Sequence, residues 1–243
     1  MAALALAAMW AVTACDPVPS QRTPTYDPTI AQSADAVVLT GPTPYAVSAS
    51  PGAALFTVPA GMTADARTLW VPDGPGTVVE DAEACATFVD VRGGLTQPGL
   101  AFRVRQEPGR LRGITVTQNA MYGVRWWVNV HVWDTDFRTA AGDPEPAIVQ
   151  GFDLTGGVSR PDGTWAPLPW RLCSRVYGRT LELKMWATEK PEPAWGTKGS
   201  TGKVVLDPQW DAPGRTGWFG GHLGSDGRLD LRDLRAWSLT SPS

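Results

Sequence analysis

Short runs of apolar residues, separated by turn residues, dominate the chain from about Tyr45 onward. Runs of about four to eight residues that alternate apolar and polar positions are typical of β-strands. Turn sequences such as Asp73-Gly74 and Gly93-Gly94 lie between them. The predicted strands are Ala54–Val58, Ala66–Val71, Cys85–Val91, Leu100–Arg105, Gly113–Gln118, Val124–Trp133, Ile148–Leu154, Trp170–Val176, Thr180–Trp186, Gly202–Leu206, Thr216–Leu223 and Leu234–Leu239.

Helical patterns are weak because Pro and Gly interrupt every long one. The best helical alternatives are Asp81–Phe88 and Leu231–Trp237, where the apolar spacing fits a helix about as well as a bulged strand. A chain of about a dozen short strands predicts an all-β protein. We therefore expect an antiparallel β-sandwich.

Period-2 alternation within two of these runs separates an apolar face from a mixed face. In residues 125–134 the apolar face holds Trp126, Val128, Val130 and Val132. The opposite face holds Trp127, Asn129, His131 and Trp133. In residues 181–186, Leu181, Leu183 and Met185 alternate with Glu182, Lys184 and Trp186. Burying the apolar faces costs least, so we expect the mixed faces to meet solvent or a ligand.

The N-terminal segment carries no charge over residues 1–14 and is shorter than the roughly 20 residues of a membrane-spanning helix. Small residues before Cys15 resemble a bacterial lipobox, in which the Cys thiol takes a lipid after cleavage. The resemblance implies a signal peptide at 1–14, a lipid on Cys15 and a location on the outer face of the bacterial cell membrane. The alternative is a buried N-terminal helix with an incidental Cys.

Residues 15–44 are rich in Pro, Ser and Thr, a composition typical of an extended tether. A short strand at residues 37–39 is the one structured element expected there. Residues 45–243 form the predicted domain. The chain is mildly acidic, with 21 Lys and Arg against 24 Asp and Glu. This charge balance, without a basic block, argues against a nucleic-acid partner.

The chain has three cysteines. Lipidation of Cys15 leaves Cys85 and Cys173 as an even pair in an oxidising compartment, which favours a disulfide between them. Two unpaired buried thiols are the alternative.

Residues 170–196 resemble concanavalin A-like, laminin-G-type jelly-roll domains of bacterial and phage proteins. There, a Trp-Arg strand leads through a Gly turn to a second strand and a Glu-Pro-x-x-Trp loop. The matching positions are Trp170, Arg171, Gly178, Leu181, Lys184, Trp186, Glu192, Pro193 and Trp195. Downstream, a Gly-rich strand at Gly217–Gly221 and a terminal strand at Leu231–Leu239 resemble the closing hairpin of the family.

The resemblance implies two curved antiparallel sheets, often a calcium ion, and often glycan or protein binding. The family also includes glycoside hydrolases, but the sequence lacks their Glu-x-Asp-x-x-Glu strand and any Gly-x-Ser-x-Gly elbow. A non-catalytic protein is therefore favoured over an enzyme. Calcium is the single cofactor considered, at Asp134 and Asp136 with Asp143 and Glu145 nearby, and a solvated acidic loop is the alternative.

Tryptophan is the most informative residue type, with 12 in the chain. Indole stacks on the flat face of a sugar while amides and charges meet its hydroxyls. The predicted ligand-binding residues are Trp127, Asn129, His131, Trp133, Lys184 and Trp186. We expect a lectin-like protein that binds a cell-envelope or extracellular glycan. The alternatives are a glycoside hydrolase and an adhesion module for protein partners, and the tryptophans could instead cover the sandwich.

Overall fold

The computed structural model describes residues 18–29, 34–41, 43–59, 66–93, 95–121, 125–136 and 146–240. Residues 1–14, the predicted signal peptide, and Cys15 lie outside these residues, so the signal peptide and the lipid anchor stay predictions. Within the described part of the chain, no helix is long and apolar enough to cross a membrane.

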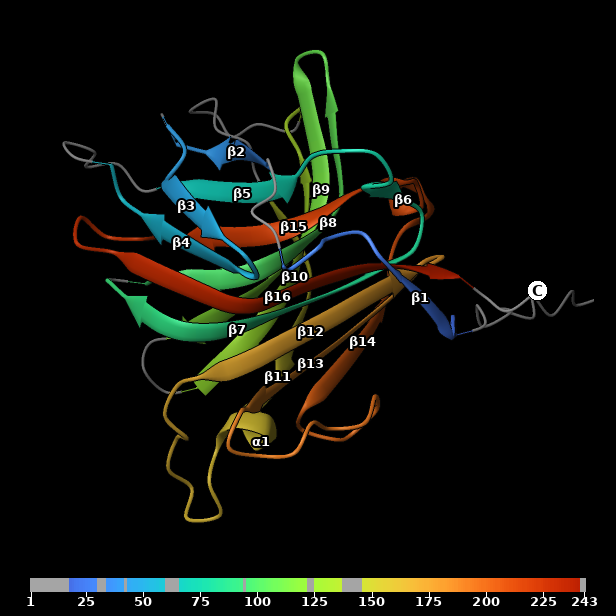
Figure 1. The fold of residues 1–243 in the computed structure, drawn as a ribbon. Coiled ribbons are helices and arrows are strands. Elements are labelled where there is room, and N and C mark those ends of the chain that lie inside the picture. Colours follow the sequence, from blue (N-terminus) through green and yellow to red (C-terminus); the bar gives the residue numbers. More distant parts are fainter. Residues whose placement is uncertain are drawn as a thin grey trace, which may run out of the picture.

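Two antiparallel sheets stack into a sandwich, as the alternation predicts (Figure 1). Sheet A has the order β14-β13-β12-β7-β16-β4-β3, with β1 paired to β16. Its strands are β1 (Gln21–Pro24), β3 (Ala46–Ser50), β4 (Ala53–Thr57), β7 (Ala82–Arg92), β12 (Trp170–Tyr177), β13 (Thr180–Ala187), β14 (Thr201–Val205) and β16 (Arg228–Thr240).

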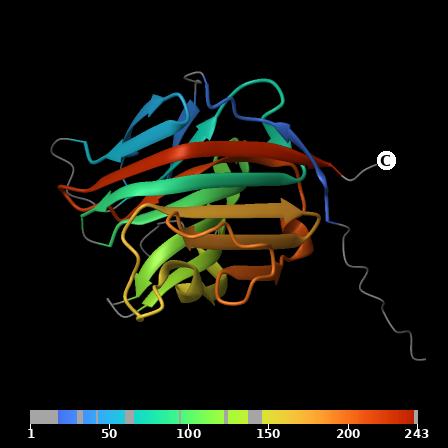
Figure 2. The same cartoon turned by 60° about the horizontal axis from the view of Figure 1, so that its bottom comes forward.

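Sheet B has the order β11-β10-β9-β8-β15-β5-β2, with β6 paired to β15. Figure 2 shows β7, β12 and β16 of sheet A lying over the green strands of sheet B. The strands of sheet B are β2 (Ala34–Thr40), β5 (Arg67–Pro72), β6 (Val78–Val79), β8 (Gln97–Glu107), β9 (Arg110–Met121), β10 (Arg125–Asp134), β11 (Ala147–Asp153) and β15 (Gly214–Gly221). Two short helices, α1 (Thr155–Val158) and η1 (Pro208–Trp210), lie in connections.

Every predicted strand overlaps an observed one, and both helical alternatives are wrong because they lie on β7 and β16. The helix-like spacing in β16 has a simple cause. The register of β16 against β7 shifts between Arg232 and Arg235, and Asp233 has a positive φ of 48°. This bulge turns both Leu231 and Leu234 toward the core, although they are three residues apart.

The main core lies between the two sheets. It takes the apolar set of β10 and the apolar set of β13, as the alternation predicts. Those core residues are Val128, Val130, Val132, Leu181, Leu183 and Met185. The side chain of Trp126 lies outside the described residues.

The short strand expected at residues 37–39 is confirmed as part of β2, but the tether predicted over residues 15–44 is wrong over β1 and β2, because both strands belong to the sandwich. Tyr26 is buried, and its ring packs edge-on against Trp70 and Trp218 at centroid distances of 6.1 and 4.9 Å. Pro24 ends β1 at the border of sheet A, a position that tolerates a missing N–H. The domain therefore begins before Tyr45.

Candidate functional site

The outer face of sheet B carries the mixed residues of β10. Trp127, Asn129 and His131 are half-buried there, opposite the valines of the core. On the neighbouring strand β9, Asn119 lies opposite Trp127 and Thr117 lies opposite Asn129. We call Trp127, Asn129, His131, Asn119 and Thr117 the β10 patch.

Both asparagines of the chain lie in this patch. Asn119 faces Trp127 across the ladder, and its carbonyl oxygen Oδ1 is buried and accepts no hydrogen bond from any residue that the structure describes. A buried acceptor without a partner costs about 1–3 kcal/mol. The patch therefore holds an acceptor that no described residue satisfies.

Gly151 of β11 leaves room for Trp127 and Asn129. It pairs with Asn129 across the strands. A Cβ atom at position 151 would lie 3.1 Å from Asn129 Oδ1 and 3.6 Å from the Trp127 ring. The absent side chain therefore keeps the indole and the amide of the patch in place.

His131 is neutral at physiological pH. Its burial, with the charge of Arg67 and the neighbouring His222, lowers the pKa of His131 to about 4. Its Nδ1 lies 3.5 Å from Thr117 Oγ1, while Arg67 Nη2 lies 2.7 Å from His222 Nε2. The patch therefore offers hydrogen-bonding groups beside the guanidinium of Arg67.

Trp133 does not join the patch. It is 2% exposed and packs with Leu69 and Phe219 in a second apolar cluster on this face. Its indole N–H donates to Thr115 Oγ1 at 2.8 Å. The prediction that Trp133 contacts a ligand is therefore corrected: Trp133 packs the β5, β10 and β15 side chains together.

Lys184 and Trp186 lie on the outer face of sheet A, so the structure does not bring them together with Trp127. They are 4% and 5% exposed. The Lys184 ammonium lies 5.6 Å from the Trp186 ring centroid and 4.4 Å from that of Trp195. It also donates to Glu192 Oε1 at 2.5 Å. Their predicted ligand role is corrected, because their own neighbours already cover both side chains.

The predicted disulfide between Cys85 and Cys173 is present. The two cysteines are cross-strand partners on β7 and β12. Trp186 packs on them, with Trp195 and Trp237 at the border of the cluster.

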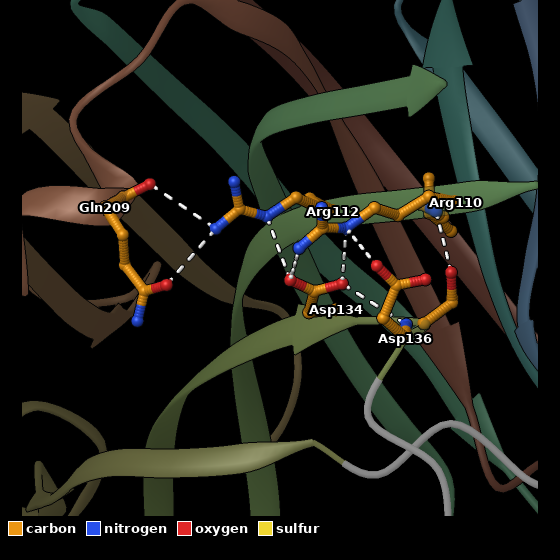
Figure 3. Close-up of polar contacts among 7 residues, drawn as sticks. Arg110, Arg112, Asp134, Asp136 and Gln209 are labelled. Carbon is orange, nitrogen blue, oxygen red and sulfur yellow. Dashed lines mark hydrogen bonds and ion pairs between the residues drawn. The ribbon is translucent and has the colours of Figure 1, made fainter. Parts of the chain in front are cut away.

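Asp134 and Asp136, the predicted calcium ligands, are engaged by arginines (Figure 3). Arg110 pairs with Asp134 Oδ2 at 2.5 Å and with Asp136 Oδ2 at 2.9 Å, and Arg112 Nε lies 3.1 Å from Asp134. The Arg110 hydrogen bond holds the pKa of Asp134 below its ordinary value. Guanidinium groups occupy the oxygens that a cation would need, so the calcium expectation at these two residues is corrected.

The other acidic residues of that prediction, Asp143 and Glu145, lie outside the described residues. Among the described residues, no group of three or more His, Cys, Asp or Glu side chains is placed to hold a metal ion.

No protein-family model matches the sequence, and no curated protein matches it. Solved structures do match in shape. The metal-free VIP36 exoplasmic/lumenal domain matches with a TM-score of 0.51 at 10% identity, over 89% of this chain and 91% of that one. The form with Ca²⁺ and Man3GlcNAc gives 0.51 at 12% identity, over 86% and 85%. The fold is concanavalin A-like.

A lectin from Bauhinia forficata in complex with GalNAc also matches, with a TM-score of 0.48 at 10% identity over 92% of this chain and 100% of that one. The likeness to the VIP36 domain establishes the concanavalin A-like fold, which was the fold class expected from the sequence.

Sequence reasoning missed the β9 and β11 members of the patch. Asn119, Thr117 and Gly151 reach this concanavalin A-like surface through strand pairing, which single-strand alternation does not reveal. One signal was available: the scarcity of asparagine, with both copies on neighbouring predicted strands.

Proposed function

We propose that this protein is a non-catalytic glycan-binding protein that uses the β10 patch. The observation that carries the proposal is the pairing of half-buried Trp127 with the unsatisfied oxygen of Asn119 on the next strand. An indole stacks on the C–H face of a sugar, and a sugar hydroxyl supplies the donor that Asn119 lacks. Asn129 and neutral His131 add further polar groups beside the ring.

The concanavalin A-like fold supports this proposal, because a solved relative in shape, VIP36, is described with Man3GlcNAc bound. The absence of a Glu-x-Asp-x-x-Glu strand supports binding without hydrolysis. The ligand class is a cell-envelope or extracellular glycan, as expected for an exported protein.

A glycan array tests the binding site directly. We expect the wild type to bind at least one glycan, and Trp127→Ala to lose about tenfold or more in affinity, since ring stacking and area burial are both removed. Trp195→Ala is the matched control, because Trp195 is also half-buried but lies beside sheet A. Asn119→Ala is expected to weaken binding while the fold is kept.

Two array results contradict the proposal. One is that the wild-type protein binds no glycan on the array. The other is an equal loss of binding in Trp127→Ala and Trp195→Ala. A repeat of the array with a chelator shows whether a metal ion contributes to binding. Among the described residues, no group of three or more His, Cys, Asp or Glu side chains is placed to hold one.

We further propose that the domain is displayed on the outer face of the cell membrane by a lipid on Cys15. The support is the charge-free apolar run that ends in small residues before Cys15. Cys15→Ser expressed in a bacterial host is expected to leave the membrane fraction and to lose metabolic labelling with a fatty acid. A Cys15→Ser protein that stays membrane-bound contradicts the anchor.

A further inference from the structure

A cavity of about 300 Å³ lies on the core side of β9, at one end of the sandwich. We call it the end pocket. Val91 comes from the end of β7 and Trp170 from the start of β12, both in sheet A, while Gln118 comes from sheet B. The end pocket is lined by Val91, Gln118, Trp165, Ala166, Leu168 and Trp170.

The wall of the end pocket is almost entirely apolar. The Trp170 indole N–H donates to the carbonyl oxygen of Ala166 at 3.0 Å, so this ring offers its apolar surface to the cavity. Trp165 and Leu168 come from the segment before β12 and pack against the main core. Indole and aliphatic walls of this kind favour a flat, apolar guest.

Gln118 is the exception in this wall. It is 2% exposed and lies opposite Val128 on the core side of sheet B. It is the one lining residue with an amide side chain. An amide holds two N–H donors and a carbonyl acceptor. The end pocket therefore presents one strongly polar side chain in a largely aromatic and aliphatic wall.

We propose that the end pocket binds a small aromatic alcohol of the phenol class. The ring packs against the indoles of Trp165 and Trp170, and the hydroxyl both donates to and accepts from the Gln118 amide. Aromatic pairs gain about 0.5–1.5 kcal/mol beyond their area burial, which favours an aryl ring over an alkyl chain. A sugar does not fit this chemistry, because most of its hydroxyls would face apolar walls.

This site is separate from the β10 patch. Gln118 and Asn119 are neighbours on β9, but their side chains lie on opposite faces of the sheet, as their partners Val128 and Trp127 show. A test of one site therefore does not decide the proposal for the other.

Calorimetric titration with phenol and with toluene tests the proposal, because toluene replaces the hydroxyl by a methyl group of similar size. We expect phenol to bind the wild-type protein more tightly than toluene. Gln118→Leu is expected to weaken phenol binding about five- to tenfold, the loss of one hydrogen bond, and to leave toluene binding equal or tighter. Ala166→Phe, which fills the cavity, is expected to abolish both. Gln150→Leu, the same change at an exposed position of β11, is the matched control and leaves both unchanged.

Three results overturn the proposal: no phenol binding to the wild type, in which case the amide holds water alone; equal phenol affinity in Gln118→Leu; or phenol binding that persists in Ala166→Phe. Should the variants fail to fold, crystals of the wild-type protein soaked with 4-iodophenol decide the matter through the iodine position. Iodine in the end pocket supports the proposal, and iodine elsewhere alone contradicts it.

Discussion

The outer faces of the two sheets carry the same sequence pattern but differ in how far their side chains are covered. On both, tryptophan and polar residues alternate with core residues along a strand. On sheet A, Trp186 is covered by the disulfide between Cys85 and Cys173 and by Lys184. On sheet B, Trp127 stays half-buried beside an unsatisfied oxygen. Alternation therefore identifies the face of a residue, and the neighbouring strands decide whether that face is closed.

The charged residues on the outer face of sheet A form ion pairs with one another. Lys203, Glu182, Arg175 and Glu83 follow one another across β14, β13, β12 and β7, with alternating sign. Arg175 pairs with Glu182 at 2.6 Å, and Arg22 of β1 pairs with Glu83 at 2.7 Å. Each of these cations thus has an anion of this chain beside it.

The largest expected effect comes from the disulfide on sheet A. Replacing Cys85 and Cys173 together by Ala is expected to lower the free energy of unfolding by about 4 kcal/mol, since the bridge closes a long loop of 88 residues in sequence separation. Urea unfolding followed by tryptophan fluorescence measures this. Glycan affinity below the unfolding transition should stay unchanged, and a loss of affinity in the folded double variant would place sheet A in the site.

A matched pair of tryptophan variants compares the two faces next. Trp186→Ala is expected to cost about 3–4 kcal/mol in unfolding free energy, because it empties a buried volume. Trp127→Ala is expected to cost about 1 kcal/mol or less, because its ring is half-buried. Thermal unfolding of both variants checks the order. Equal losses in stability would mean that Trp127 is a packing residue.

The pH dependence of stability gives an intermediate effect. His131 has a pKa of about 4 in the folded protein, against 6.5 as its ordinary value. The unfolded state therefore takes up the proton first. The contribution of His131 is complete above about pH 6.5 and is lost as the pH falls toward 4. We expect the thermal midpoint of the wild type to decrease over that window more steeply than that of His131→Gln. Parallel curves for the two proteins would show that the histidine titrates normally.

The smallest effect is expected at Gly151. Gly151→Ala places a Cβ atom 3.1 Å from Asn129 Oδ1, so the amide must move by a few tenths of an ångström. Stability should change by roughly 0.5 kcal/mol or less, while glycan affinity drops a few-fold because the amide is displaced. Gly163→Ala changes a turn glycine outside the patch and serves as the comparison for binding alone, because its positive φ of 81° makes the substitution itself strained. An unaltered affinity in Gly151→Ala would remove Asn129 from the site.

The strands were predictable because period-2 alternation and turn residues are local. The core set of β10 followed for the same reason. Covering residues were not predictable, because they come from distant strands. Trp133 is closed off with Leu69 and Phe219, and Asp134 is neutralised by Arg110. β1 was missed, and β2 was predicted over residues 37–39 alone, because both strands are short and lie among prolines, where composition resembles a tether.

The pairing of β1 with β16 has a consequence for the order of folding. Gln21 lies opposite Thr240, so this ladder joins chain segments about as far apart in sequence as the described residues allow. Closing so long a loop carries a large entropic cost and returns only a four-residue, solvent-exposed ladder. We expect β1 to dock last, after the other strands have assembled, and to open first under native conditions. Backbone amides of β1 should therefore exchange with deuterium well before those of β7, the strand at the centre of sheet A.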